Sequence, residues 1–359
     1  MPDFQSHVFA RGLVNASRRI IDVPSGHRLR ECHGHTFRVT VSAPLRDAGP
    51  AEFEKQLRQC VAPLDFSYLN DVVDDPADER LTRWIKSRFE PANSTLNVGV
   101  RSAEPWTSTI DNEGLVLVSH EFQFNASHWL PNVPAGHQCA RLHGHHFSVI
   151  ISVRARAFPE NSMLLYDLIA RHWHPIKQQL QGHCLNDIPG LENPTSELLA
   201  LWLWQKLEDS LPGLATISIC ETVTAGCSFD GAVFRIWKDQ RFESAFDNPM
   251  AAGENKVSGR GYLLRLNLVA PLDETAGWVY DFGEVKESFK PFMQRLDHRH
   301  LNELAIGDGI NSKELAEWLM EQLPKKMPRL DRIDLFDSST AGLIVTNTGQ
   351  SPQFGYPLV

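Results

Sequence analysis

The stretch NASHWLPNVPAGHQCARLHGH at residues 125–145 repeats NASRRIIDVPSGHRLRECHGH at residues 15–35, at an offset of 110 residues and without a gap. Self-similarity at a fixed spacing indicates repeated structural units. A weaker third copy follows. SGRGY at 258–262 lies 115 residues after HGHHF at 143–147, and each of these runs leads into a segment of alternating apolar and polar residues. The sequence therefore predicts three tandem modules, at residues 1–112, 113–240 and 241–359.

Each module has the pattern strand, strand, helix, helix, strand, strand. Apolar and β-branched residues predict half-buried strands at Arg38–Ser42, Phe147–Val153 and Tyr262–Val269. Apolar residues at helical spacing predict helices over 167–180, 197–207, 284–295 and 313–323, with Thr195 and Ser312 as N-caps. Closing strand pairs are predicted at 215–224 with 232–237 and at 332–337 with 342–346.

Two helices on one face of a four-stranded antiparallel sheet form an α+β layer. A free sheet edge is open to unwanted pairing, and three such sheets joined edge to edge can close a barrel that has no free edge. We therefore expect an α+β fold in which three modules close one twelve-stranded barrel.

The composition excludes several classes of protein. The 359 residues include 35 Lys and Arg against 44 Asp and Glu, a net charge of −9, with no basic block of the kind that binds duplex nucleic acid or an anionic membrane. No apolar stretch is long enough to cross a bilayer, and the first ten residues lack the layout of a signal peptide, so we expect a cytoplasmic protein. The six cysteines contain no CxxC pair, which favours reduced thiols.

Three histidines in the middle module are candidate metal ligands. His143 and His145 are two residues apart, so on a strand they project from the same face. His128 ends the preceding strand-like segment, and three imidazoles on adjacent strands predict a zinc site with one open position, the arrangement typical of catalytic zinc. The alternative is that these are loop histidines that water or backbone groups satisfy.

Cys139 lies four residues before His143. Close to a zinc ion its thiol could be held partly as thiolate and serve as a base or nucleophile. An isolated cysteine is more commonly a small buried hydrophobe, and both interpretations remain open at this point.

At these residues the middle module resembles the 6-pyruvoyl-tetrahydropterin synthase family, and within it the 6-carboxytetrahydropterin synthases of the queuosine pathway. The matching runs are LPNVPAGHQCARLHGH at 130–145, LNDIPGLENPTSE at 185–197 and ETVTAGCSFDG at 221–231, with GWVYDF at 277–282 and RLDHRHLNEL at 295–304 in the third module. The resemblance implies the tunnelling fold, in which three subunits close a twelve-stranded barrel and the active sites lie where neighbours meet. It also implies that two such barrels stack face to face, so we expect a homodimer of pseudo-trimers.

The family's site residues are divided among the modules. The resemblance implies zinc ligands at His128, His143 and His145 and a catalytic thiol at Cys139, but the middle module has Gln181-Gly182 where the family has an acid/base pair. The third module keeps that pair as Asp297-His298 and has Phe246, Ser258 and Arg260 in place of the zinc ligands.

The first module has Arg18, His33 and His35 at the zinc positions, Leu29 at the thiol position and Asp65-Phe66 at the pair. Whether His33 and His35 bind a second metal stays open. The retained halves are complementary, and we expect one active site per chain between the second and third modules.

The resemblance implies a carbon–carbon lyase. Zn²⁺ would activate the side-chain hydroxyls of 7,8-dihydroneopterin triphosphate, Cys139 would move a proton, and His298, oriented by Asp297, would be the partner acid/base. The products would be 6-carboxy-5,6,7,8-tetrahydropterin, acetaldehyde and triphosphate.

Glu221 would anchor the pterin by accepting two N–H bonds, and the corresponding residues in the other modules are Ser102 and Asp337. Thr195 would lie in the pocket or only cap a helix. Two alternatives remain: the pyruvoyl-forming activity of the same family, and a pterin-binding regulatory module without turnover.

Overall fold

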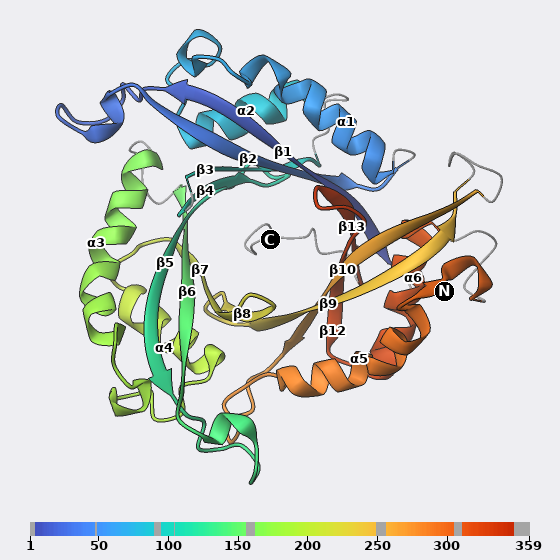
Figure 1. Cartoon of the computed structure of the whole chain (residues 1–359). Coiled ribbons are helices and arrows are strands. Elements are labelled where there is room, and N and C mark those ends of the chain that lie inside the picture. The colour runs from blue at the N-terminus through green and yellow to red at the C-terminus, as the bar shows by residue number, and fades with distance from the viewer. Residues whose placement is uncertain are drawn as a thin grey trace.

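Twelve strands close an antiparallel barrel with helices around its outside in the computed structural model (Figure 1). The order of the strands is β10-β12-β13-β1-β2-β3-β4-β5-β6-β7-β8-β9, and β9 pairs with β10 to complete the ring. The structure describes residues 4–46, 49–89, 95–103, 105–155, 162–248, 256–304 and 311–347. The predicted α+β class and the closed barrel are confirmed.

The three modules have the same succession of elements. The first contains β1 (Gln5–Arg18), β2 (His33–Pro44), α1 (Pro50–Val61), α2 (Asp78–Arg88), β3 (Asn97–Ala103) and β4 (Trp106–Ile110). The second contains β5 (Val116–His128), β6 (His143–Arg154), α3 (Ser162–Leu180), α4 (Ser196–Leu207), β7 (Leu214–Thr222) and β8 (Ala225–Phe229). The third contains β9 (Phe234–Asp247), β10 (Val257–Ala270), α5 (Phe282–Leu296), the two-residue β11 (Arg299–His300), α6 (Ser312–Gln322), β12 (Leu330–Phe336) and β13 (Ala341–Thr346).

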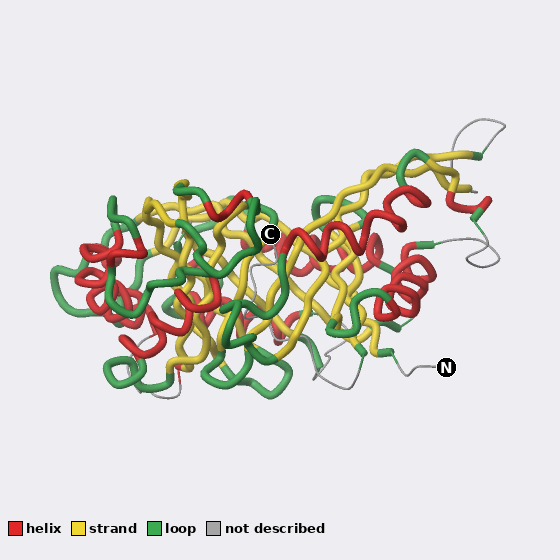
Figure 2. The backbone as a smooth tube through the Cα atoms, turned by 90° about the horizontal axis from the view of Figure 1, so that it is seen from below, coloured by secondary structure: helices red, strands yellow, loops and turns green. Residues whose placement is uncertain are grey.

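The strand register supports the residue equivalences drawn from the sequence. The first two strands of each module form a long ribbon. Its last paired residues are Arg18 with His33 in the first module and His128 with His143 in the second, and in the third module Phe246 pairs with Ser258 one position before the last pair. Figure 2 shows the strands passing through the middle of the molecule and the helices at its periphery, with the ribbon of β9 and β10 extending past the neighbouring elements. Among the described helices, none has the length and apolar character needed to cross a bilayer.

Successive side chains of each strand point to opposite faces of the sheet, and apolar and polar residues alternate, so one face is apolar and the other is polar. The apolar face packs under the helices in a core shared by all three modules, as at Leu264 and Leu266 of β10. Arg265 lies between them on the opposite face, where its guanidinium donates to both oxygens of Asp239 at 2.7 and 3.0 Å. Paired charges of this kind keep the inner wall of the barrel polar without leaving a buried charge unmatched.

Two local predictions are wrong. Residues 232–237 were expected to close the second module, but β8 closes it, and Phe234 begins the long first strand of the third module. The predicted boundary between residues 240 and 241 therefore lies inside β9. Thr195 caps α4 as expected by accepting from Leu198 N, whereas Asn311, not Ser312, caps α6 in a capping box with Glu314.

A glycine on β8 marks a point of close backbone approach. A Cβ added to Gly226 would lie 2.4 Å from the carbonyl oxygen of Ile219 and 2.4 Å from the ring of Trp237. Gly342 has the equivalent place on β13, where a Cβ would lie 2.2 Å from the carbonyl oxygen of Leu335. Glycine is required at both positions because no side chain fits between the strands.

The substitution Gly226→Ala should lower the free energy of unfolding by about 1–3 kcal/mol, because the new methyl group overpacks a rigid wall. Chemical denaturation of both proteins measures the difference. Gly261→Ala is the matched control, since nothing lies within 4 Å of the added Cβ. Equal stability losses in the two variants would contradict the steric explanation.

Candidate active site

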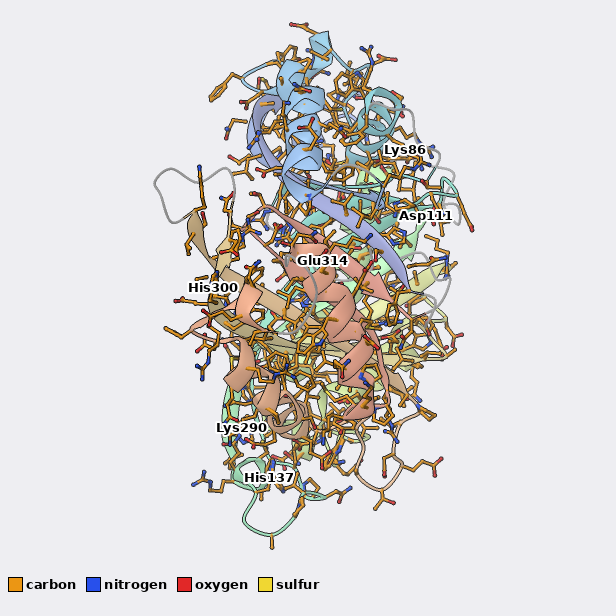
Figure 3. The ribbon with its side chains drawn as sticks, turned by 90° about the vertical axis from the view of Figure 1, so that its right-hand side faces the viewer. Lys86, Asp111, His137, Lys290, His300 and Glu314 are labelled. Carbon is orange, nitrogen blue, oxygen red and sulfur yellow. The ribbon has the colours of Figure 1, made fainter. Side chains whose placement is uncertain are left out.

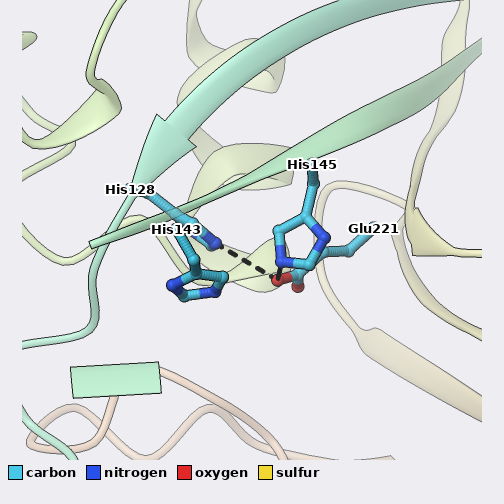
Figure 4. Close-up of side chains that lie close together, drawn as sticks. All are labelled: His128, His143, His145 and Glu221. Atoms are coloured by element: carbon cyan, nitrogen blue, oxygen red, sulfur yellow. Dashed lines mark ion pairs between the residues drawn. The ribbon is translucent and has the colours of Figure 1, made fainter. Parts of the chain in front are cut away.

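Three imidazoles and one carboxylate converge at the end of the β5–β6 ribbon (Figure 4). His128 is the last residue of β5, His143 and His145 begin β6, and Glu221 lies near the end of β7. One ligand atom from each lies within 4.8 Å of the others. The predicted meeting of His128, His143 and His145 therefore occurs, as expected from two residues on one strand face and a third on the paired strand.

Hydrogen bonds behind the rings prepare two of these histidines to bind a cation. His128 Nδ1 donates to Pro194 O at 3.0 Å, and His143 Nδ1 donates to Arg141 O at 2.7 Å. A ring that carries its proton on Nδ1 leaves the lone pair of Nε2 for a metal. Among the described residues, the buried His128 Nε2 has no partner in hydrogen-bonding geometry. The donor set therefore fits Zn²⁺, which prefers nitrogen and carboxylate ligands.

Glu221 is part of the same cluster. Its Oε1 lies 2.9 Å from His145 Nε2 and 3.3 Å from His128 Nε2, and its Oε2 accepts from Ser196 Oγ at 2.9 Å. Burial would raise the pKa of this carboxyl, but its close contacts with His128 and His145 outweigh burial and lower the pKa below its usual range. The sequence predicted Glu221 as a pterin anchor, and the structure adds that its carboxylate is within reach of the metal position.

A cavity of about 590 Å³ opens beside this cluster, between the second and third modules. Its lining from the second module is Leu130, His137, Gln138, Cys139, Arg141, His143, His145, Thr195, Ser196, Glu197, Glu221, Thr222 and Ala225. Its lining from the third module is Lys238, Trp278, Tyr280, Asp281, Phe282, Gly283 and Lys286. The cavity is of the size that binds small molecules, and its lining combines charged and polar side chains with aromatic and aliphatic ones.

Cys139 lies in this cavity on a short 3-10 turn, Gln138–Ala140. Partial burial and the negative charges of Glu221 and Asp281 raise the pKa of its thiol. Thr195 also lines the cavity, and its Oγ1 donates to Gly277 O at 2.5 Å while accepting from Leu198 N. The structure thus places both expected residues at the site, and for Thr195 the pocket and the helix cap coincide.

Asp297 and His298 lie elsewhere. Neither is among the described residues that line this cavity, and His298 instead lines a shallow depression on the β9–β10 ribbon with Arg260 and His300. Figure 3 shows His137, which lines the cavity, and His300 toward the same side of the view but at different heights. The expectation that both halves of the site meet within one chain is therefore not met.

The reason is a backbone contact that recurs in all three modules. The chain after the first long helix folds back onto its own module's first strand, where Phe66, Gly182 and His298 donate their N–H groups to Asn15 O, Asn125 O and Glu243 O at 2.6, 2.7 and 2.6 Å. All three residues have positive φ, at 53°, 78° and 54°. The preceding side chains of Asp65, Gln181 and Asp297 accept from the same strands at 2.8, 3.1 and 2.9 Å. This turn keeps the pair over its own ribbon.

Arginines occupy the metal region in the other two modules. Arg18, which is equivalent to His128, is fully buried and pairs with Asp78 at 2.7 Å, and Ser102 donates to the same aspartate at 2.6 Å. In the third module Arg260 pairs with Asp337 at 3.4 Å. A guanidinium thus neutralises the acid that a cation would otherwise face, and among the described residues only the second module presents a metal-binding group.

Glu197 is a functional candidate that the sequence alone did not single out. Its carboxyl is buried at the cavity wall and accepts from Val279 N at 2.9 Å. Burial raises its pKa to about 7 despite that hydrogen bond. A carboxyl that titrates near neutral pH can hold or release a proton. The sequence places Glu197 two residues after Thr195, but it does not reveal that the third module buries the Glu197 carboxyl.

Glu197 should make the stability of the metal-free protein depend on pH. Between about pH 4.5 and pH 7 the folded protein keeps this proton while the unfolded chain loses it, so stability falls as pH rises, by on the order of 3 kcal/mol. Glu197→Gln should remove this loss. Urea unfolding of both proteins in a chelator, at pH 5 and at pH 8, measures how much stability each one loses between the two pH values. An equal loss in the parent and in the variant would contradict the assignment.

Arg18→His should create a second metal site with His33 and His35, because a bound cation would take over the charge that now neutralises Asp78. Metal analysis after zinc loading should give one more Zn²⁺ per chain than the parent. Arg18→Gln, which removes the charge and adds no ligand, is the control. Unchanged zinc content in Arg18→His would show that the first module cannot regain a site.

The chain matches the family model described as 6-pyruvoyl tetrahydropterin synthase twice, over residues 117–232 and 235–348. It is 35% identical over 120 residues to 6-carboxy-5,6,7,8-tetrahydropterin synthase of Synechocystis, which covers 32% of this chain and 92% of that protein. It is 29% identical over 86 residues to dihydroneopterin monophosphate aldolase of Pyrococcus furiosus, and the match covers 23% of this chain and 74% of that protein.

Solved structures with a partial match include 6-pyruvoyl tetrahydropterin synthase of Caenorhabditis elegans, at 18% identity over 32% of this chain and 96% of that chain, with a TM-score of 0.28. Uricase of Arthrobacter globiformis matches at 12% identity over 60% and 80%, with a TM-score of 0.33. Two matches to one family model span more than half of the residues. The chain belongs to the 6-pyruvoyl tetrahydropterin synthase family.

Proposed function

We propose that the chain is a zinc-dependent lyase that converts 7,8-dihydroneopterin triphosphate to 6-carboxy-5,6,7,8-tetrahydropterin, acetaldehyde and triphosphate, as in queuosine biosynthesis. The observation that carries the proposal is a metal-ready histidine cluster beside Cys139 in one cavity. The cyanobacterial relative supports the carboxy-forming reaction through its name and its coverage. Lys238, Lys286 and Arg141 on the cavity wall suit an anionic, phosphorylated substrate.

The protein's own groups have separate tasks in this proposal. His128, His143 and His145 would hold Zn²⁺, which supplies Lewis-acid polarisation of substrate hydroxyls when bound. Glu221, whose oxygens lie at the cavity wall, accepts N–H bonds from the 2-amino-pyrimidinone edge of the pterin. Cys139 takes a proton from the substrate side chain, and Glu197 is a second group that holds a proton near neutral pH.

The partner acid/base must come from a second copy, because Asp297 and His298 do not reach the cavity of their own chain. Asp297 Oδ2 lies 2.9 Å from His298 Nδ1, and this hydrogen bond and the aspartate's charge raise the pKa of His298. The His298 side chain is 77% exposed and ready to enter a neighbouring molecule. In a two-fold dimer each copy gives its metal half to one site and its Asp-His pair to the other.

Incubation of the purified protein with 7,8-dihydroneopterin triphosphate should release acetaldehyde and give 6-carboxytetrahydropterin by mass. A pyruvoyl product would place the chain in the other branch of the family. Tight pterin binding without any product would favour a regulatory module.

The origin of the acid/base pair can be tested by mixing two inactive variants, His298→Ala and Cys139→Ala. Hybrid dimers contain one site with both groups intact, so mixing after mild dissociation should restore roughly a quarter of the parent activity. Both variants should retain zinc, whereas His143→Ala should lose it. If the pair acted within its own chain, no hybrid site would be complete and the mixture would stay inactive.

A further inference from the structure

His137, in the loop that carries Cys139, faces the third module. His137 is the N-cap of the 3-10 turn Gln138–Ala140, and its Nδ1 accepts from the backbone N–H of Cys139 at 3.2 Å. On the other side of the ring, Nε2 faces Asp281 Oδ2 at 3.7 Å. The imidazole therefore stands between the thiol-bearing turn of the second module and a carboxylate of the third.

The hydrogen bond from the backbone N–H of Cys139 selects one tautomer of the neutral His137 ring. Because Nδ1 accepts a backbone N–H, it holds a lone pair, and the ring proton of the neutral histidine is on Nε2, directed at Asp281. A carboxylate at that position favours this tautomer over the other. The tautomer in turn is the one that can hold Cys139 N–H.

Asp281 is itself rigidly placed. It caps α5, and its Oδ1 accepts from Gly283 N at 2.5 Å and Glu284 N at 3.2 Å, which leaves Oδ2 for His137. The segment before it docks on the second module, where Asn132 Nδ2 donates to Thr275 O at 2.8 Å and Asn193 Nδ2 donates to Ala276 O at 2.8 Å. The position of Asp281 thus follows from the packing of one module on the other.

A closer contact between the equivalent residues exists at the junction of the first and second modules, where histidine and carboxylate are at hydrogen-bond distance. His27 Nδ1 accepts from Leu29 N at 3.2 Å, and His27 Nε2 lies 2.8 Å from Asp167 Oδ2. Leu29 stands where the second module has its thiol, so this junction has the contact without the reactive group. Comparing the two junctions therefore distinguishes a general structural role of the histidine–carboxylate contact from a specific effect on the Cys139 thiol.

We propose that His137 and Asp281 are positioning residues that hold the Cys139 thiol in the cavity across the module junction. The inference rests on the proposed function, in which the Cys139 thiol takes part in the reaction. It gives the third module a part in fixing the position of that thiol. It also assigns to the third module a contribution within its own chain, through Asp281, which lines the cavity that Asp297 and His298 do not line.

The test compares Asp281→Asn with Asp167→Asn in the full chain. Asparagine at position 281 keeps the cap of α5. Asp167 lies inside α3, where asparagine removes a carboxylate that faces His27 and, at 3.8 Å, Arg28. The rate at which iodoacetamide alkylates Cys139, followed by peptide mass spectrometry, should rise about fivefold in Asp281→Asn, since the turn loosens and a negative charge near the thiol is lost. Asp167→Asn should stay at the parent rate.

In the active enzyme, Asp281→Asn should lower kcat about tenfold with KM unchanged, because a misplaced thiol slows the proton transfer more than it weakens binding. Asp281→Ser, which also keeps the cap, provides a second variant if the first is unstable. An alkylation rate equal to that of the parent, or equal changes at both junctions, would overturn the proposal. The alkylation measurement needs no pterin turnover, so it gives its answer even if the proposed reaction is incorrect.

Discussion

Pairing between the edge strands of neighbouring modules is the constraint on which the rest of the structure depends. β4 pairs with β5, β8 with β9, and β13 with β1, all antiparallel. A four-stranded sheet with two helices would leave two open edges, and these three seams remove every one of them. The seam between β8 and β9 also brings Ala225 beside Lys238, so it forms the floor of the cavity between the second and third modules.

At the end of each ribbon a buried acid needs a positive partner, and the three modules supply that partner in different ways. An acidic group lies near the strand ends in every module. Arg18 supplies that charge to Asp78, and Arg260 supplies it to Asp337. Among the described residues, only the second module places imidazoles around its acid, Glu221, so there a cation bound from solution can supply the positive charge.

Sequence reasoning reached the repeats, the barrel and the metal cluster because each rests on local spacing or on a match in register. It could place His143 and His145 on one face, and it could identify Ser258 and Arg260 as their replaced equivalents. It failed where a contact joins segments far apart in the chain. The hydrogen bond from His298 N to Glu243 O holds the acid/base pair over its own ribbon, and nothing in the spacing of residues 295–304 reveals that bond.

Closure of the ring within one polypeptide changes what a single mutation can do. In a ring of three identical subunits every substitution appears three times, so a change that harms one cleft harms all of them. Here the codons for Arg18, His128 and Phe246 are separate, and each can drift without affecting the other two. One chain can therefore hold a metal-binding cluster in one module and arginine pairs at the equivalent places in the other two.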